Sequence, residues 1–230
     1  ETALHAAAGR GDEAIVRLLL ACRANPNAAE TDGWTALHSA CGEGHHAAAE
    51  VLLLHGAHLA PMVRSSHLGA DVGVTPLHVA CAGDYLETVK LLLNRSADLC
   101  AADGDGWTPL HVACALGFVE NVDYLLSQRA SPGARDHAGE TPLHLAHARG
   151  HDTIARLLLD RVSASALGSE DARGRTTLHS ATSEGQICVA RALSGLWVSL
   201  SRGAPLVSQA HVSTPTLGTW RAWLRNPLRA

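Results

Sequence analysis

The sequence is poor in aromatic residues and in lysine. Phe, Trp and Tyr make up only 3% of its 230 residues, and Lys90 is the single lysine. Large rings therefore cannot dominate a core, and the hydrophobic share of 47% must come mainly from Ala, Leu and Val. Such residues suit thin, closely packed layers. Because charged residues account for 17%, we expect the chain to fold rather than to be disordered throughout.

Long apolar runs and a strong excess of charge are also absent. No run approaches the roughly 18 residues that a membrane-spanning helix requires. The richest stretch, residues 51–63, is interrupted by two His, one Gly and one Pro. The formal net charge is −4, so nothing indicates bulk attraction to nucleic acids or anionic membranes. We therefore expect neither membrane insertion nor nucleic-acid binding.

Motifs for enzymatic chemistry are missing as well. The sequence has no nucleophile elbow, no phosphate-binding loop and no zinc-protease motif, so we expect no enzymatic activity and no cofactor. A metal site formed by His144, His147 and His151 is disfavoured, because Gly150 would end the helix before the third ligand. Six cysteines without a dense framework indicate reduced thiols, and hence a cytoplasmic location, with the nucleus as the alternative.

A tetrapeptide that recurs six times organises the sequence. It begins with Thr, has Leu in third place and ends with His, and its threonines are separated by 33, 40, 33, 33 and 35 residues. The copies occupy residues 2–5, 35–38, 75–78, 108–111, 141–144 and 176–179. The basic period is therefore 33 residues, with insertions of seven and two.

Each copy predicts a pair of helices. The Thr is a good N-cap, and the Pro that follows it in three copies fits the first helical position. A short apolar helix then ends at a Gly that suits a left-handed turn, although Asp84 stands there in the third copy. A second helix with apolar residues at helical spacing follows. A polar segment rich in Gly and Asp then returns to the next Thr as a projecting hairpin.

These motifs resemble the ankyrin repeat family, whose pattern Asp-x-x-Gly-x-Thr-Pro-Leu-His is matched in full by residues 103–111. The resemblance covers about residues 1–194. It implies an all-α solenoid of stacked antiparallel helix pairs, with hairpin loops, here called fingers, projecting from one edge. Helices of about 8 to 10 residues are marginal alone, so each pair must bury its apolar face on its neighbours.

We predict one ankyrin repeat domain over residues 1–195 and an atypical tail over residues 196–230. The repeats are expected at residues 1–30, 31–70, 71–103, 104–136, 137–171 and 172–195. The pattern decays after Gly185, and the tail has three Trp and no acidic residue. A terminal repeat usually presents a polar cap. We therefore expect the tail to be poorly ordered or to form a loosely docked cap.

The repeated His and Cys residues are expected to serve the framework. Each motif His should bond its own N-cap Thr and the backbone of the neighbouring finger. Cys41, Cys81 and Cys114 share one register on the first helices. We expect them to be small core residues without redox chemistry.

Positions that the framework does not need indicate function. They lie at the finger tips and on the exposed, concave side of the first helices. Trp34 and Trp107 stand at finger positions expected to face solvent. Each either packs onto the next finger or anchors a protein partner, as exposed Trp often does. The other candidate contact residues are Asp32, Glu43, Asp105, Leu116, His137, Glu140, Arg149 and Arg175.

Two local features carry open alternatives. The insertion at residues 61–73 is either a tolerated loop or a partner contact. Asn27 lies at a hairpin position where ankyrin proteins often carry an Asn, and in some members of the family that Asn is a substrate for asparaginyl hydroxylation. The resemblance therefore implies a candidate modification site, and a simple turn residue is the alternative.

The prediction for function is a non-catalytic scaffold, monomeric on its own, that binds a protein partner through the concave face and the fingers. The alternative is a substrate-recognition or regulatory part of a larger assembly, such as a ubiquitin-ligase adaptor. In that case the effector region would lie outside this chain.

Overall fold

The computed structural model describes residues 1–60, 73–161 and 174, and its regular structure there is helical. The helices are α1 (Ala3–Arg10), α2 (Glu13–Ala21), α3 (Ala36–Gly42), α4 (His46–Leu54), α5 (Pro76–Ala82), α6 (Leu86–Asn94), α7 (Pro109–Leu116), α8 (Val119–Ser127), α9 (Pro142–Ala148) and α10 (Asp152–Leu159). Within the described part, the one β-type pairing is an isolated bridge between Ala29 and Thr35. The all-α prediction is therefore confirmed.

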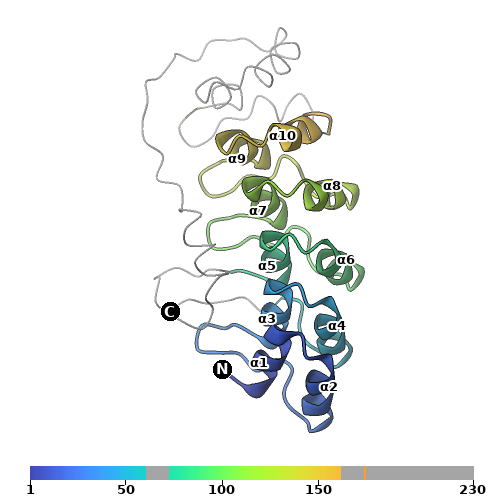
Figure 1. Ribbon diagram of the computed structural model, residues 1–230. Helices are drawn as coiled ribbons and strands as arrows, with labels where there is room; N and C mark the ends of the chain where they lie inside the picture. The colour runs from blue at the N-terminus through green and yellow to red at the C-terminus, as the bar shows by residue number, and fades with distance from the viewer. Residues whose placement is uncertain (61–72, 162–173, 175–230) are drawn as a thin grey trace.

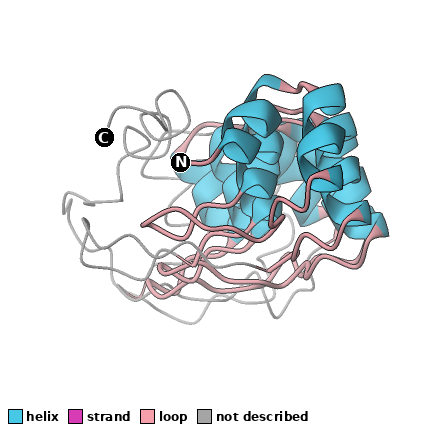
Figure 2. Ribbon diagram, turned by 90° about the horizontal axis from the view of Figure 1, so that it is seen from below, coloured by secondary structure: helices cyan, strands magenta, loops and turns pink. Residues whose placement is uncertain are grey.

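The helices stack in two columns (Figure 1). In one column each odd-numbered helix packs on the next, from α1 through α9, and in the other each even-numbered helix does the same. Within a repeat the two helices also pack on each other, as α1 does on α2. Loops that join successive pairs extend beyond the helices on one side (Figure 2). This arrangement confirms the predicted solenoid with projecting fingers.

Each odd-numbered helix begins at its motif Thr. Thr2, Thr35, Thr75, Thr108 and Thr141 are the N-caps and have extended backbone conformations. The His at the third helical position folds back, and its Nδ1 accepts a bond of 3.1–3.3 Å from the Thr backbone N–H. This is a capping box in which His replaces the usual Glu or Gln.

Left-handed residues end the first helices, as the sequence predicts. Gly11, Gly44, Gly117 and Gly150 have φ between 72° and 86°, and Asp84 adopts φ 61° in the third copy. Gly117 has a second reason to lack a side chain. A Cβ there would lie 2.6 Å from Cε1 of His151, whose ring packs on this turn from the next repeat. The glycine thus serves both the turn and the stacking of repeats.

The core lies between the two columns and is built from Leu, Ala and Val. The motif leucines Leu37, Leu77, Leu110 and Leu143 are at most 1% exposed. Cys41, Cys81 and Cys114 are completely buried and free. Burial raises the pKa of these thiols, so they remain protonated and unreactive. Their predicted role as small core residues is confirmed.

Several predictions fall outside the described residues. These are the insertion, apart from Gly73, most of the sixth repeat, Arg175 and the tail. The predicted domain and repeat boundaries there stay predictions. Among the described helices, none is long and apolar enough to cross a membrane.

Candidate functional site

Two of the described fingers are closed by an aspartate at their base. Asp103 donates its backbone N–H to the carbonyl of Trp107 at 2.9 Å, and its Oδ1 accepts from the N–H groups of Trp107 at 2.7 Å and of Asp105 at 3.0 Å. Asp136 closes the next finger on Glu140 in the same way. In the first complete finger, Glu30 stands at this position, and Asp32 accepts from the N–H of Trp34 instead.

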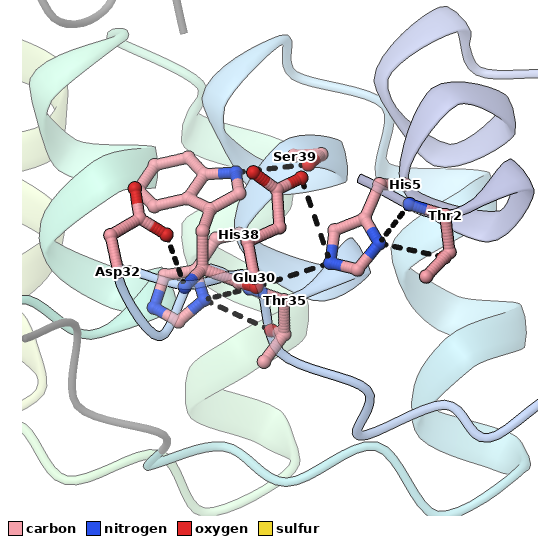
Figure 3. A network of polar contacts seen from close by, with 8 residues as sticks. Thr2, His5, Glu30, Asp32, Thr35, His38 and Ser39 are labelled. Atoms are coloured by element: carbon pink, nitrogen blue, oxygen red, sulfur yellow. Dashed lines mark hydrogen bonds and ion pairs between the residues drawn. The ribbon is translucent and has the colours of Figure 1, made fainter.

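The motif histidines join each repeat to the next finger. Nδ1 lies 2.8–2.9 Å from the hydroxyl of its own Thr. For His5, His38, His78 and His111, Nε2 lies 2.9–3.3 Å from the carbonyl of the residue before the next motif Thr. Figure 3 shows the link from Thr2 through His5 to the next finger and the contact of His38 with Thr35. The predicted structural role is confirmed for these four histidines. His144 bonds its own Thr141, and His179 lies outside the described residues.

These contacts also fix the tautomer of the imidazoles. A carbonyl only accepts, so Nε2 must carry the proton and Nδ1 must accept from Thr. Burial lowers the pKa of His78 and of His111 to about 4, although backbone hydrogen bonds oppose the effect. Both rings are therefore neutral at physiological pH.

Trp34 and Trp107 do not face solvent, so the placement predicted for them is wrong. They are only 7% and 6% exposed. Trp34 stacks on His38 with ring centroids 4.7 Å apart, and its Nε1 donates to Ser39 Oγ at 2.9 Å. The Nε1 of Trp107 donates to Asp136 Oδ2 at 3.0 Å. Trp107 thus reaches the next finger, as the packing alternative expected, whereas Trp34 bonds the first helix of its own repeat.

The remaining candidates differ in exposure. Glu43, Asp105 and His137 are exposed, and Asp32, Leu116, Glu140 and Arg149 are half-buried. We call these seven residues the finger-side surface.

Neighbouring repeats bring part of this surface together. The backbone N–H of His137 donates to the carbonyl of Asp105 at 2.9 Å, which links two fingers. Leu116 and Arg149 occupy one register at the ends of α7 and α9. Burial lowers the pKa of Arg149, and the carboxylate of Glu140 opposes this shift. Asp32 and Glu43 belong to the second repeat, farther along the stack.

Sequence reasoning missed the burial of two carboxylates. Asp103 and Asp136 are 7% and 8% exposed. Desolvation raises the pKa of Asp103 to about 6, against the effect of the two N–H donors, and also raises the pKa of Asp136. Both residues stand at the start of an Asp-x-x-Gly motif, and this position could have predicted their burial. A side chain that closes a finger points into that finger.

Asn27 braces the first two repeats. Its Nδ2 donates to the carbonyl of Gly56 at 2.9 Å, and its Oδ1 accepts from the N–H of His58 at 2.7 Å. Its backbone N–H donates to Asn25 Oδ1 at 2.9 Å. The side chain is therefore engaged in an inter-repeat contact, whereas the backbone N–H takes part in a turn.

The run of three histidines does not converge. His144 bonds Thr141, and Nε2 of His151 lies 3.2 Å from the carbonyl of Ala115. His147 is completely buried. Across residues 1–60, 73–161 and 174, no group of three or more His, Cys, Asp or Glu side chains could hold a metal ion.

Comparison with known families accounts for the repeated architecture. A family model described as ankyrin repeats matches the chain in three copies, over residues 1–62, 58–136 and 128–196. The matches overlap and together include every helix from α1 to α10. A search of curated proteins finds no match.

Proposed function

Because the chain belongs to the ankyrin repeat family, we propose that it is a non-catalytic scaffold that binds a protein partner through its finger-side surface. Ankyrin repeats generally serve as modules for protein–protein interaction. The observation that supports this surface is the contrast between framework and surface residues. Motif residues are buried and hydrogen-bonded, whereas the side chains of Glu43, Asp105 and His137 are exposed and form no hydrogen bond within the described part.

The charges of this surface favour a partner segment with basic residues. It carries the carboxylates of Asp32, Glu43, Asp105 and Glu140 and the guanidinium of Arg149. Complementary charge speeds association and selects partners, and its effect weakens as salt screens it. We therefore expect binding that falls with ionic strength.

The test compares charge-reversal variants of the full chain as bait for affinity capture. Glu43→Arg combined with Asp105→Arg should remove the partners that the wild type retains. Glu120→Arg is the matched control, because Glu120 is exposed but lies on α8, in the other column. If the double variant keeps the same partners, or if the control loses them as well, the proposed surface is wrong.

The adaptor alternative makes a different prediction for the captured proteins. Because the effector region would lie outside this chain, the adaptor alternative is tested on the protein isolated from cells. There, a part of a ubiquitin ligase would co-purify with ligase subunits, and those subunits should remain when the finger-side charges are reversed. A simple scaffold, monomeric on its own and located in the cytoplasm or nucleus, would show a single set of partners that the double variant loses. Size measurement of the native complex separates the two outcomes.

We also propose Asn27 as a candidate site of asparaginyl hydroxylation, on the strength of the family resemblance. Peptide mass spectrometry of the protein from cells tests it. A peptide heavier by one oxygen atom at Asn27 is expected, and an unmodified residue in all peptides would contradict the proposal.

A further inference from the structure

The outer side of the first helix pair carries exposed apolar residues. Ile15 is 47% exposed and Leu18 is 63% exposed, one helical turn apart on α2. Ala3, at the start of α1, is exposed too. α1 and α2 form one end of the stack (Figure 1). We call Ala3, Ile15 and Leu18 the end face.

In every other described repeat, the residues at the positions equivalent to the end face are covered. The counterparts of Ile15 at the repeat spacing are at most 1% exposed: Ala48, Thr88, Asn121 and Ile154. The counterparts of Leu18 are Val51, Leu91, Tyr124 and Leu157, which are buried or half-buried. Those of Ala3 are Ala36, Pro76, Pro109 and Pro142, all buried. Among the repeats that the structure describes, exposure in this register is therefore found in the first pair alone.

The preceding pair of helices causes this burial. α3 packs on α1 and α4 packs on α2, and each later pair repeats the contact. The comparison of Ile15 with Ile154 is direct, because the same residue at the same register is 47% exposed in α2 and completely buried in α10. A helix pair that ends a stack usually presents polar residues outward, whereas this one presents Ile and Leu.

We propose that the end face is a docking surface for a further ankyrin-type helix pair carried on the same polypeptide ahead of α1. Continuity with the established interfaces between repeats supports this occupant. Every described interface joins consecutive pairs connected through a finger. The inference does not depend on the proposed function of the finger-side surface.

The experiment supplies such a pair from the chain itself. Residues 107–139 are duplicated directly ahead of Glu1, so the new junction reproduces the sequence that leads into Thr141. The extended chain should melt about 5 °C or more above the full chain, because the added pair covers Ile15 and Leu18. Leu18→Glu should abolish most of this gain. Leu54→Glu, at 62% exposure on α4 and away from the end face, should preserve it.

Four results would overturn the proposal. The first is an extended chain that melts at the same temperature as the full chain. The second is a gain that survives Leu18→Glu. The third is a dimer of the full chain, seen by sedimentation velocity, that Leu18→Glu dissociates, since the occupant would then be a second copy. In the protein isolated from cells, peptide mapping should find a further repeat joined to Glu1, and an endogenous amino terminus at Glu1 would also contradict the proposal.

Discussion

At the scale of single residues, Trp34 and Trp107 show how one repeat position acquires two different roles. Both indoles are buried at the base of a finger, but Trp34 donates to Ser39, which is half-buried, and Trp107 donates to the buried carboxylate of Asp136. Water can replace the indole for a hydroxyl near the surface, whereas a buried carboxylate that loses a donor stays desolvated. The two hydrogen bonds should therefore differ in energetic weight.

Replacing each Trp by Phe tests this difference. Trp107→Phe should lower the free energy of unfolding by about 1–3 kcal/mol more than the loss of ring area alone, because Asp136 loses a donor. Trp34→Phe is the matched control and should cost less. Urea denaturation followed by circular dichroism gives both values. Equal losses would mean that the Asp136 contact adds nothing.

Asn121 is the clearest local mismatch between residue and environment. It is completely buried in α8, and neither Nδ2 nor Oδ1 has a hydrogen-bond partner among the described residues. Ile154 occupies the same register in α10 without any polar atom to satisfy. Asn121→Leu should raise the free energy of unfolding by about 1–2 kcal/mol, because it removes an unsatisfied buried amide.

The control for Asn121→Leu separates burial from helix propensity. Asn94→Leu makes the same exchange at an exposed position of α6. It should change stability by only a few tenths of a kcal/mol, within the usual range for surface positions. A thermal midpoint that falls in Asn121→Leu would show that a partner such as bound water satisfies the amide.

At the scale of helices, the end of α5 departs from its counterparts. Asp84 holds φ 61°, where four other repeats have glycine in the described part. A side chain in this region of φ crowds the backbone, although Asp tolerates it better than most residues. Asp84→Gly should therefore raise the free energy of unfolding by about 0.5–1 kcal/mol.

Asp84→Ala tests whether strain or charge is responsible. It removes the carboxylate but keeps the Cβ, so it should stabilise nothing and should weaken the turn. Both variants are compared by the urea midpoint. If Asp84→Ala stabilises as much as Asp84→Gly, the carboxylate rather than the backbone is the cause.

The elements could be predicted from the sequence because their signals are local. The Thr cap, the Pro after it and the closing Gly lie within one repeat, and each acts on its own helix. The burial of Trp34 and Trp107 could not be predicted in this way, since it depends on side chains that the stack brings over them. Asp136, 29 residues after Trp107, is such a neighbour. The exposure of finger residues is therefore decided between repeats rather than within them.

At the scale of the whole molecule, stability comes from contacts between successive pairs, so an effect repeated at several junctions accumulates. The buried motif histidines provide such a repeated effect. His78 and His111 have pKa values of about 4 in the folded protein, against 6.5 for the unperturbed group. Because the folded pKa is lower, their contribution to stability is complete above about pH 6.5 and is lost as the pH falls toward 4. Asp103 acts in the opposite direction, because its folded pKa is raised from 3.8 to about 6.

Taken together, these three pKa shifts predict that the folded protein is destabilised in mild acid. Between about pH 7.5 and about pH 5.5, each of the two histidines should remove on the order of 1 kcal/mol, and Asp103 should return a smaller amount. The free energy of unfolding should thus fall by about 1–2 kcal/mol, measured by urea denaturation at each pH. Asp103→Asn cannot gain a proton, so its stability should fall more steeply over the same range. A wild-type midpoint that holds or rises on acidification would show that the imidazoles accept protons without leaving their contacts between repeats.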